Sequence, residues 1–170
     1  MFRKPIRVQY WAILALSLLL MGTLCKASDT TYDRESLRGL PGVSVVVEGL
    51  GDIGKQAGLT VEQLQTDVEL KLRQAGIKVL SKSEVRSTPG APHLYVNVYM
   101  LQSGACHIDV RVNQFARLER RNSTRVIAST WSIEALGFTP AIQAAATIRR
   151  NVGARVDRFI SAYLAVNPRK

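Results

Sequence analysis

Three stretches of the chain, 93–102, 106–118 and 125–136, alternate apolar and polar residues, and this pattern constrains the fold more than any other feature. Successive residues of a strand point to opposite faces of a sheet, so a period of two predicts strands. Ser103-Gly104 and residues 121–124 are typical of turns. The pattern therefore predicts an antiparallel meander with one face covered and one face wet. Its apolar positions are Leu94, Val96, Val98, Met100, Ile108, Val110, Val112, Ile127, Trp131 and Ile133.

Two amphipathic helices are predicted around this meander. The first starts with the capping-box pair Thr60 and Gln63, and Thr139-Pro140 opens a second helical region that Asn167-Pro168 ends. The apolar stripe of the first helix is formed by Val61, Leu64, Val68, Leu72 and Ala75.

Short strands at 43–48 (VSVVVE) and 77–80 (IKVL) flank the first helix, and residues 81–92 are expected to form a polar loop. The expected order of elements is β-α-β-β-β-β-α. This order predicts a two-layer α+β sandwich, in which a mostly antiparallel sheet carries both helices on one face.

The N-terminus is typical of an export signal. Arg3, Lys4 and Arg7 precede an apolar run from Trp11 to Met21, whose 11 residues are fewer than the roughly 20 that span a membrane. We expect a signal peptide at 1–27, cleaved after Ala27, then a flexible lead-in at 28–42 and one domain at 43–168. Two alternatives stay open, namely lipidation of Cys25 in a loose lipobox and an uncleaved N-terminal anchor. The protein is expected to be periplasmic or secreted, with membrane association only under these alternatives.

Charge and cysteine content narrow the classes of partner. The 170-residue chain carries a net charge of +10, and loss of four basic residues with the leader leaves 19 basic against 13 acidic residues, or +6. No run of five like charges occurs, so nucleic acid is not an expected partner. Without the leader Cys106 is the single cysteine, which excludes an intramolecular disulfide.

Residues 49–54 (GLGDIG) match the G-x-G-x-x-G pattern of dinucleotide-binding proteins after a predicted strand. In that motif the third glycine lies in the first turn of a helix. Here the helix is expected only from Thr60, so the pattern favours a flexible connection without a cofactor. A small-ligand or nucleotide site in the loop Gly49–Gly58 is the alternative.

Few residues could carry chemistry. Cys106, His107 and Asp109 suggest a thiol site, but neighbouring strand residues face opposite ways and Cys106 cannot readily meet His107. Glu48 and Asp52 flank the glycine loop without the spacing of a metal site. We therefore predict no catalytic, cofactor or metal residue, and a protein that is not an enzyme.

Two segments carry a family resemblance: 59–80, LTVEQLQTDVELKLRQAGIKVL, and 92–102, PHLYVNVYMLQ. They resemble the anticodon-binding-like α/β domain of exported bacterial proteins. That group includes the N-terminal domain of the Tol-system propeller protein, the curli-secretion lipoprotein and periplasmic activators of penicillin-binding proteins. The stretch VDRFISAYLAVNP also resembles a set of uncharacterised secreted bacterial proteins. The resemblance implies an envelope accessory protein that binds another envelope protein.

Overall fold

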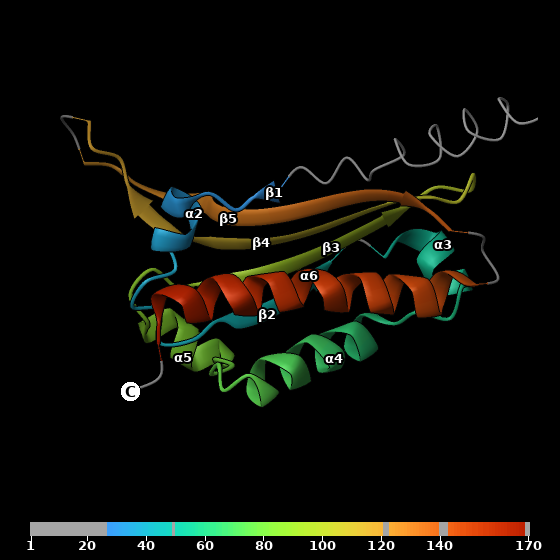
Figure 1. The fold of residues 1–170 in the computed structure, drawn as a ribbon, viewed down its shortest axis with the longest axis horizontal. Coiled ribbons are helices and arrows are strands. Elements are labelled where there is room, and N and C mark those ends of the chain that lie inside the picture. The colour runs from blue at the N-terminus through green and yellow to red at the C-terminus, as the bar shows by residue number, and fades with distance from the viewer. Residues whose placement is uncertain (1–26, 49, 121–122, 140–142, 169–170) are drawn as a thin grey trace, which may run out of the picture.

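The computed structural model describes residues 27–48, 50–120, 123–139 and 143–168 (Figure 1). The predicted signal sequence up to residue 26, including Cys25, and Pro140 lie outside these residues. Strands and helices both contribute, so the α+β class predicted from the sequence is confirmed. In chain order the elements are β1 (Ala27–Ser28), α2 (Thr31–Glu35), β2 (Ser44–Glu48), α3 (Gly51–Gln56), α4 (Val61–Gln74), α5 (Lys82–Ser87), β3 (His93–Met100), β4 (Ala105–Arg117), β5 (Arg125–Phe138) and α6 (Ala144–Val166).

The sheet has the strand order β1-β5-β4-β3-β2. The predicted meander is present as β3, β4 and β5, which pair antiparallel with their neighbours. The remaining strands form the two edges: β1 pairs antiparallel with β5, and β2 pairs parallel with β3. Because β2 is at the edge of the sheet, one row of its backbone N–H and C=O groups has no partner strand.

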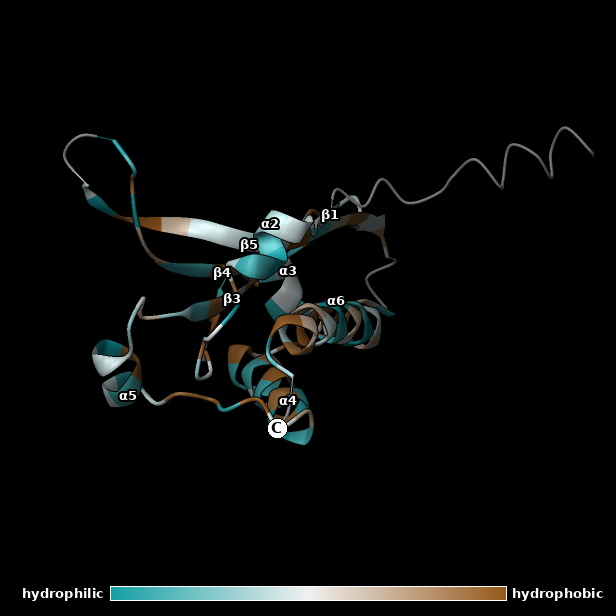
Figure 2. Ribbon diagram, turned by 60° about the vertical axis from the view of Figure 1, so that its left-hand side comes forward, coloured by the Kyte–Doolittle hydropathy of each residue, from teal (hydrophilic) through white to brown (hydrophobic). Residues whose placement is uncertain are grey.

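Helices α4 and α6 cover one face of the sheet and lie side by side (Figures 1 and 2). Their apolar stripes are buried with the inward residues of the strands, and Trp131 of β5 meets Phe159 of α6 edge-on at 5.4 Å between ring centroids. Two ion pairs on the outside join the helices, Lys71 with Asp157 at 2.6 Å and Arg149 with Asp67 at 2.7 Å. Burial of apolar side chains, at about 1.5–3 kcal/mol for each large one, is the main stabilising contribution.

The predicted strand at 77–80 is reduced to a single bridge. Val43 N–H donates to Lys78 C=O at 3.1 Å, and Leu80 N–H donates to Val43 C=O at 2.9 Å, so Val43 and Val79 pair in parallel. The chain then leaves β2, because Ser81 is the N-cap of α5. The prediction of a loop at 81–92 was wrong for Lys82–Ser87, which are helical.

The expected flexible lead-in, residues 28–42, contains regular structure. Helix α2 follows the N-cap Thr30, and the Asp29 carboxylate accepts hydrogen bonds from Arg34 Nε at 2.7 Å and from Trp131 Nε1 at 3.3 Å. The Asp29 side chain is only 7% exposed. The contact with Trp131 attaches the start of the described chain to the core. The prediction of a flexible lead-in did not include this contact.

The face on which Ile127 lies also differs from the prediction. Ile127 does not share the buried face of Trp131 and Ile133 but is 70% exposed. Val112 pairs with Trp131 whereas Asn113 pairs with Ser129, so Thr130 is an extra residue in β5. Such a bulge inverts the inward and outward alternation beyond it, which moves Ile127 to the outer face.

Candidate binding groove

The free edge of β2 begins where the bridge to Val79 ends. Ser44 N–H donates to Pro92 C=O at 3.0 Å, on the β3 side, whereas the N–H and C=O groups of Val43 face Lys78 and Leu80 on the opposite side. Backbone groups alternate in direction along a strand, so Val45 and Val47 turn theirs away from β3. Within the described part of the chain, neither residue's N–H or C=O has a hydrogen-bond partner on that side.

Local chemistry holds the chain away from this edge. Ser81 Oγ accepts from Glu84 N–H at 3.2 Å, and Ser81 N–H donates to Glu84 Oε2 at 2.9 Å, which completes a capping box for α5. Lys78 pairs with the other oxygen of Glu84 at 2.7 Å. The hydrogen bonds from Lys78 and then Ser81 lower the pKa of Glu84 to about 2. Glu84 is therefore ionised at neutral pH and caps the start of α5.

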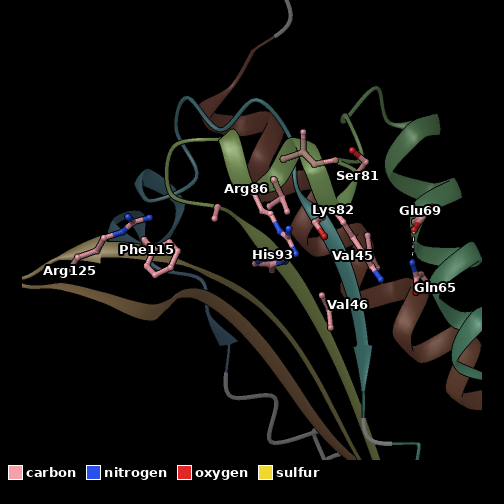
Figure 3. Close-up of a pocket in the computed structure, with 14 residues that line it drawn as sticks. Val45, Val46, Gln65, Glu69, Ser81, Lys82, Arg86, His93, Phe115 and Arg125 are labelled. Carbon is pink, nitrogen blue, oxygen red and sulfur yellow. Dashed lines mark hydrogen bonds between the residues drawn. The ribbon is translucent and has the colours of Figure 1, made fainter.

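A groove of about 610 Å³ opens where the chain has left the edge (Figure 3). One wall is α4, another is α5, and the floor is made by β2 and the start of β3. Figure 3 shows Phe115 and Arg125 at the end of the groove opposite α4. The residues that line the groove include Val45, Val46, Glu69, Lys82, Arg86 and Arg125.

The groove combines apolar surface with cationic side chains. Arg125 lies 3.8 Å from the centroid of the Phe115 ring, a cation–π contact that holds the guanidinium at the groove end. His93 contributes an imidazole whose burial lowers its pKa, so it is neutral at pH 7. The Nδ1 atom of His93 is buried and has no hydrogen-bond partner in the described residues. Such a surface suits an extended peptide, whose backbone can pair with β2 and whose side chains can contact the apolar and cationic residues.

The glycine loop differs from its prediction. Gly51 is the first residue of α3, so a helix starts well before Thr60, and the argument that no helix follows the glycines was wrong. This helix has 6 residues, which gives it a small dipole, and Gly49 lies outside the described residues. A side chain at Gly51 would meet no atom within 4 Å. The groove beside β2 does not include these glycines.

Asp52, next to this loop, has only an exposed lysine, Lys55, as its ion partner, at 4.0 Å. No cluster of three or more His, Cys, Asp or Glu side chains suited to a metal ion occurs among the described residues.

The structure separates Cys106 from His107 and Asp109, as the strand alternation requires. Cys106 is buried on the core side, and this burial raises the pKa of its thiol. His107 lies on the outer face, where its Nε2 is 3.5 Å from Glu134. Asp109 lies on the face of β4 opposite Cys106 and is only 4% exposed, because it is in the middle of the sheet, opposite Asn97 of β3 and Glu134 of β5. Its carboxylate pairs with Arg111 at 2.6 Å.

Comparison with known proteins gives no family for this chain. No protein-family model matches it, and no curated protein gives a significant match. Within the described residues no helix has both the length and the apolar character needed to cross a membrane. The groove beside β2 is the candidate functional site, and the sequence analysis did not predict it. The S-x-x-E spacing of Ser81 and Glu84 was the signal that could have indicated the helix beside it.

Proposed function

We propose that this chain is an exported envelope or periplasmic accessory protein that binds a partner protein by strand addition to β2. An extended segment of the partner would lie in the groove and continue the pairing that Val79 begins. The observation that carries this proposal is the outward backbone N–H and C=O of Val45, which have no partner among the described residues and lie beside the groove that Val45 lines. Unpaired edges are templates for another strand, and peptide-binding domains use them in this way.

Backbone pairing accounts for affinity, and the groove accounts for position. Each N–H and C=O of Val45 that pairs with the partner replaces a hydrogen bond to water, at a net gain of about 0.5–1.5 kcal/mol. The apolar and cationic walls then select the side chains of the added segment, since these alternate between its two faces. The proposed role needs no catalytic step.

The export part of the proposal is supported by the sequence of the leader. The charged start, the short apolar run and Ala27 are typical of a cleaved signal. Cleavage there would place the new terminus at Ser28, directly before the Asp29 contacts with Arg34 and Trp131. If Cys25 were lipidated instead, only a few residues would separate the lipid from this anchored point.

The test combines photo-crosslinking in the cell envelope with two variants at one position. A crosslinking amino acid placed at Val46 should capture a partner. In Val45→Pro the edge N–H is lost, while the ladder to β3 is kept because Val45 donates nothing to β3. Val45→Ala removes packing but keeps the N–H. We expect crosslinking to fall at least tenfold in Val45→Pro and to persist in Val45→Ala. Equal yields in both folded variants would contradict strand addition.

A further inference from the structure

We propose that the segment bound along β2 is acidic: an extended peptide that alternates apolar residues with Asp or Glu, whose carboxylates bind Lys82 and Arg86. This inference rests on the proposed function and adds the chemical class of the ligand. The supporting observation is which charged side chains around the groove form ion pairs within the chain and which do not.

Two cations stand one helical turn apart on α5. Lys82 and Arg86 both line the groove and are both exposed, and neither forms an ion pair with another described residue. Side chains at this spacing lie on the same face of a helix, so they present their charges together. Four other cations differ from these two, because a carboxylate lies within 2.6–2.8 Å of each of Lys71, Arg73, Lys78 and Arg149.

The carboxylate in the groove wall is already engaged. Glu69 Oε1 accepts from Gln65 Nε2 at 2.9 Å, and Glu69 Oε2 pairs with Arg73 at 2.8 Å. Its charge is therefore balanced from within α4. The charge that the groove offers to a ligand is positive, which favours an acidic partner and disfavours a basic one.

Arg125 adds positive charge at the far end of the groove, on β5, and β4 and β3 lie between it and β2. Arg125 is held over Phe115, so its guanidinium is oriented before any ligand arrives. The close-up shows Arg86 on α5 and Phe115 beside Arg125 at this end (Figure 3). An added strand would turn alternate side chains toward this surface and toward α4. Acidic residues at every second position meet Lys82 and Arg86, and the residues between them turn toward α4.

Peptides of defined charge test the inference. The probes are two nine-residue peptides with blocked termini, one alternating valine with glutamate and one alternating valine with lysine. Binding to the full domain is followed by NMR, both as affinity and as the shift of the Val45 amide. At 50 mM salt we expect the glutamate peptide to bind at least tenfold more tightly than the lysine peptide. In Lys82→Glu/Arg86→Glu, both exposed changes, this preference should reverse.

The control carries the same charge change elsewhere. Arg120→Glu/Arg150→Glu alters exposed residues outside the groove and should shift both affinities by less than threefold. Equal binding of the two peptides with a shifted Val45 amide would overturn the acidic preference and leave strand addition intact. Glutamate-peptide binding that leaves the Val45 amide unchanged, or no binding of either peptide, would overturn both proposals.

Discussion

Val43 and Val79 form one parallel bridge, and two residues after Val79 the chain turns away from β2 at Ser81. The strand that the sequence predicts at 77–80 therefore ends almost as soon as it starts pairing. The consequence is an edge on which Val45 and Val47 have no strand beside them. The proposed binding site depends on the place at which α5 begins.

The apolar face of α4 gives a first prediction. Leu72 is 0% exposed, whereas its neighbour Arg73 is exposed and pairs with Glu69 across one turn. Leu72→Asp places an unpaired charge in the core and should cost more than about 3 kcal/mol, enough to unfold the domain. Arg73→Ala should leave the melting temperature almost unchanged, since exposed pairs contribute little. Similar melting temperatures for the two variants would show that Leu72 is not on the buried face of α4.

Two glycines should differ in their tolerance of a side chain. Gly51 has φ +54° but faces open space, so Gly51→Ala should cost only about 1–2 kcal/mol from the left-handed backbone. At Gly42 an added Cβ would collide with the Lys78 carbonyl, the group that accepts from Val43 N–H. Gly42→Ala should therefore be the more destabilising change in denaturant unfolding. The opposite ranking would mean that the Val43–Val79 bridge is dispensable.

Asp29 should stabilise the domain in a pH-dependent way. The hydrogen bonds from Arg34, with those from Trp131 and charge from Arg158, lower the pKa of Asp29 against the effect of burial. A carboxylate with a lowered pKa stabilises the fold above its unfolded pKa and loses this contribution as pH falls through the folded pKa. Asp29→Asn should cost about 1–3 kcal/mol at pH 7 and progressively less below about pH 4.

Melting temperatures from pH 2 to pH 7 measure this dependence. Glu35→Gln is the matched control, because Glu35 also pairs with an arginine, Arg38, but in an exposed position. Its effect should be small at every pH. A pH-independent cost of Asp29→Asn would contradict the assigned role of the carboxylate.

Ionisation of Asp109 should change stability with pH in the direction opposite to that of Asp29. Burial raises its pKa, and Glu134 adds to this, while Arg111 and His107 oppose it. The folded state then keeps a proton that the unfolded state has lost, so stability falls as pH rises from about 4 through the raised pKa. Asp109→Asn cannot ionise and escapes this loss. Relative to the parent protein, the variant should gain melting temperature between pH 4 and pH 7; a constant difference would contradict the sign.

The long elements could be predicted because their patterns are long. Eight alternating residues in β3 and the stripe of Leu64, Val68 and Leu72 bury one side of a regular structure, which leaves a periodic trace in the sequence. Helix α5 has 6 residues and too few turns for such a trace, so only its cap could have indicated it. The extra residue Thr130 leaves no trace either, because a bulge is set by pairing with β4.

The groove and the Asp29 anchor are tertiary features. Asp29 and Trp131 are 102 residues apart in the chain, and no local pattern relates them. The groove needs α5, the open side of β2 and the end of the β4–β5 pair to meet in space. The sequence predicted a protein-binding role only in general terms, and the β2 edge could not be predicted because it depends on where the chain leaves Val79.

Amide hydrogen exchange at β2 tests the central claim most directly. Ser44 N–H donates to Pro92 C=O, and Val46 faces β3 in the same way, whereas Val45 faces the open edge. In the isolated domain, NMR should show Val45 exchanging at least a hundredfold faster than Val46, and the captured partner or the glutamate peptide should abolish this difference. Equal protection of Val45 and Val46 in the free protein, or a Val45 amide that stays unprotected in the complex, would contradict strand addition at β2.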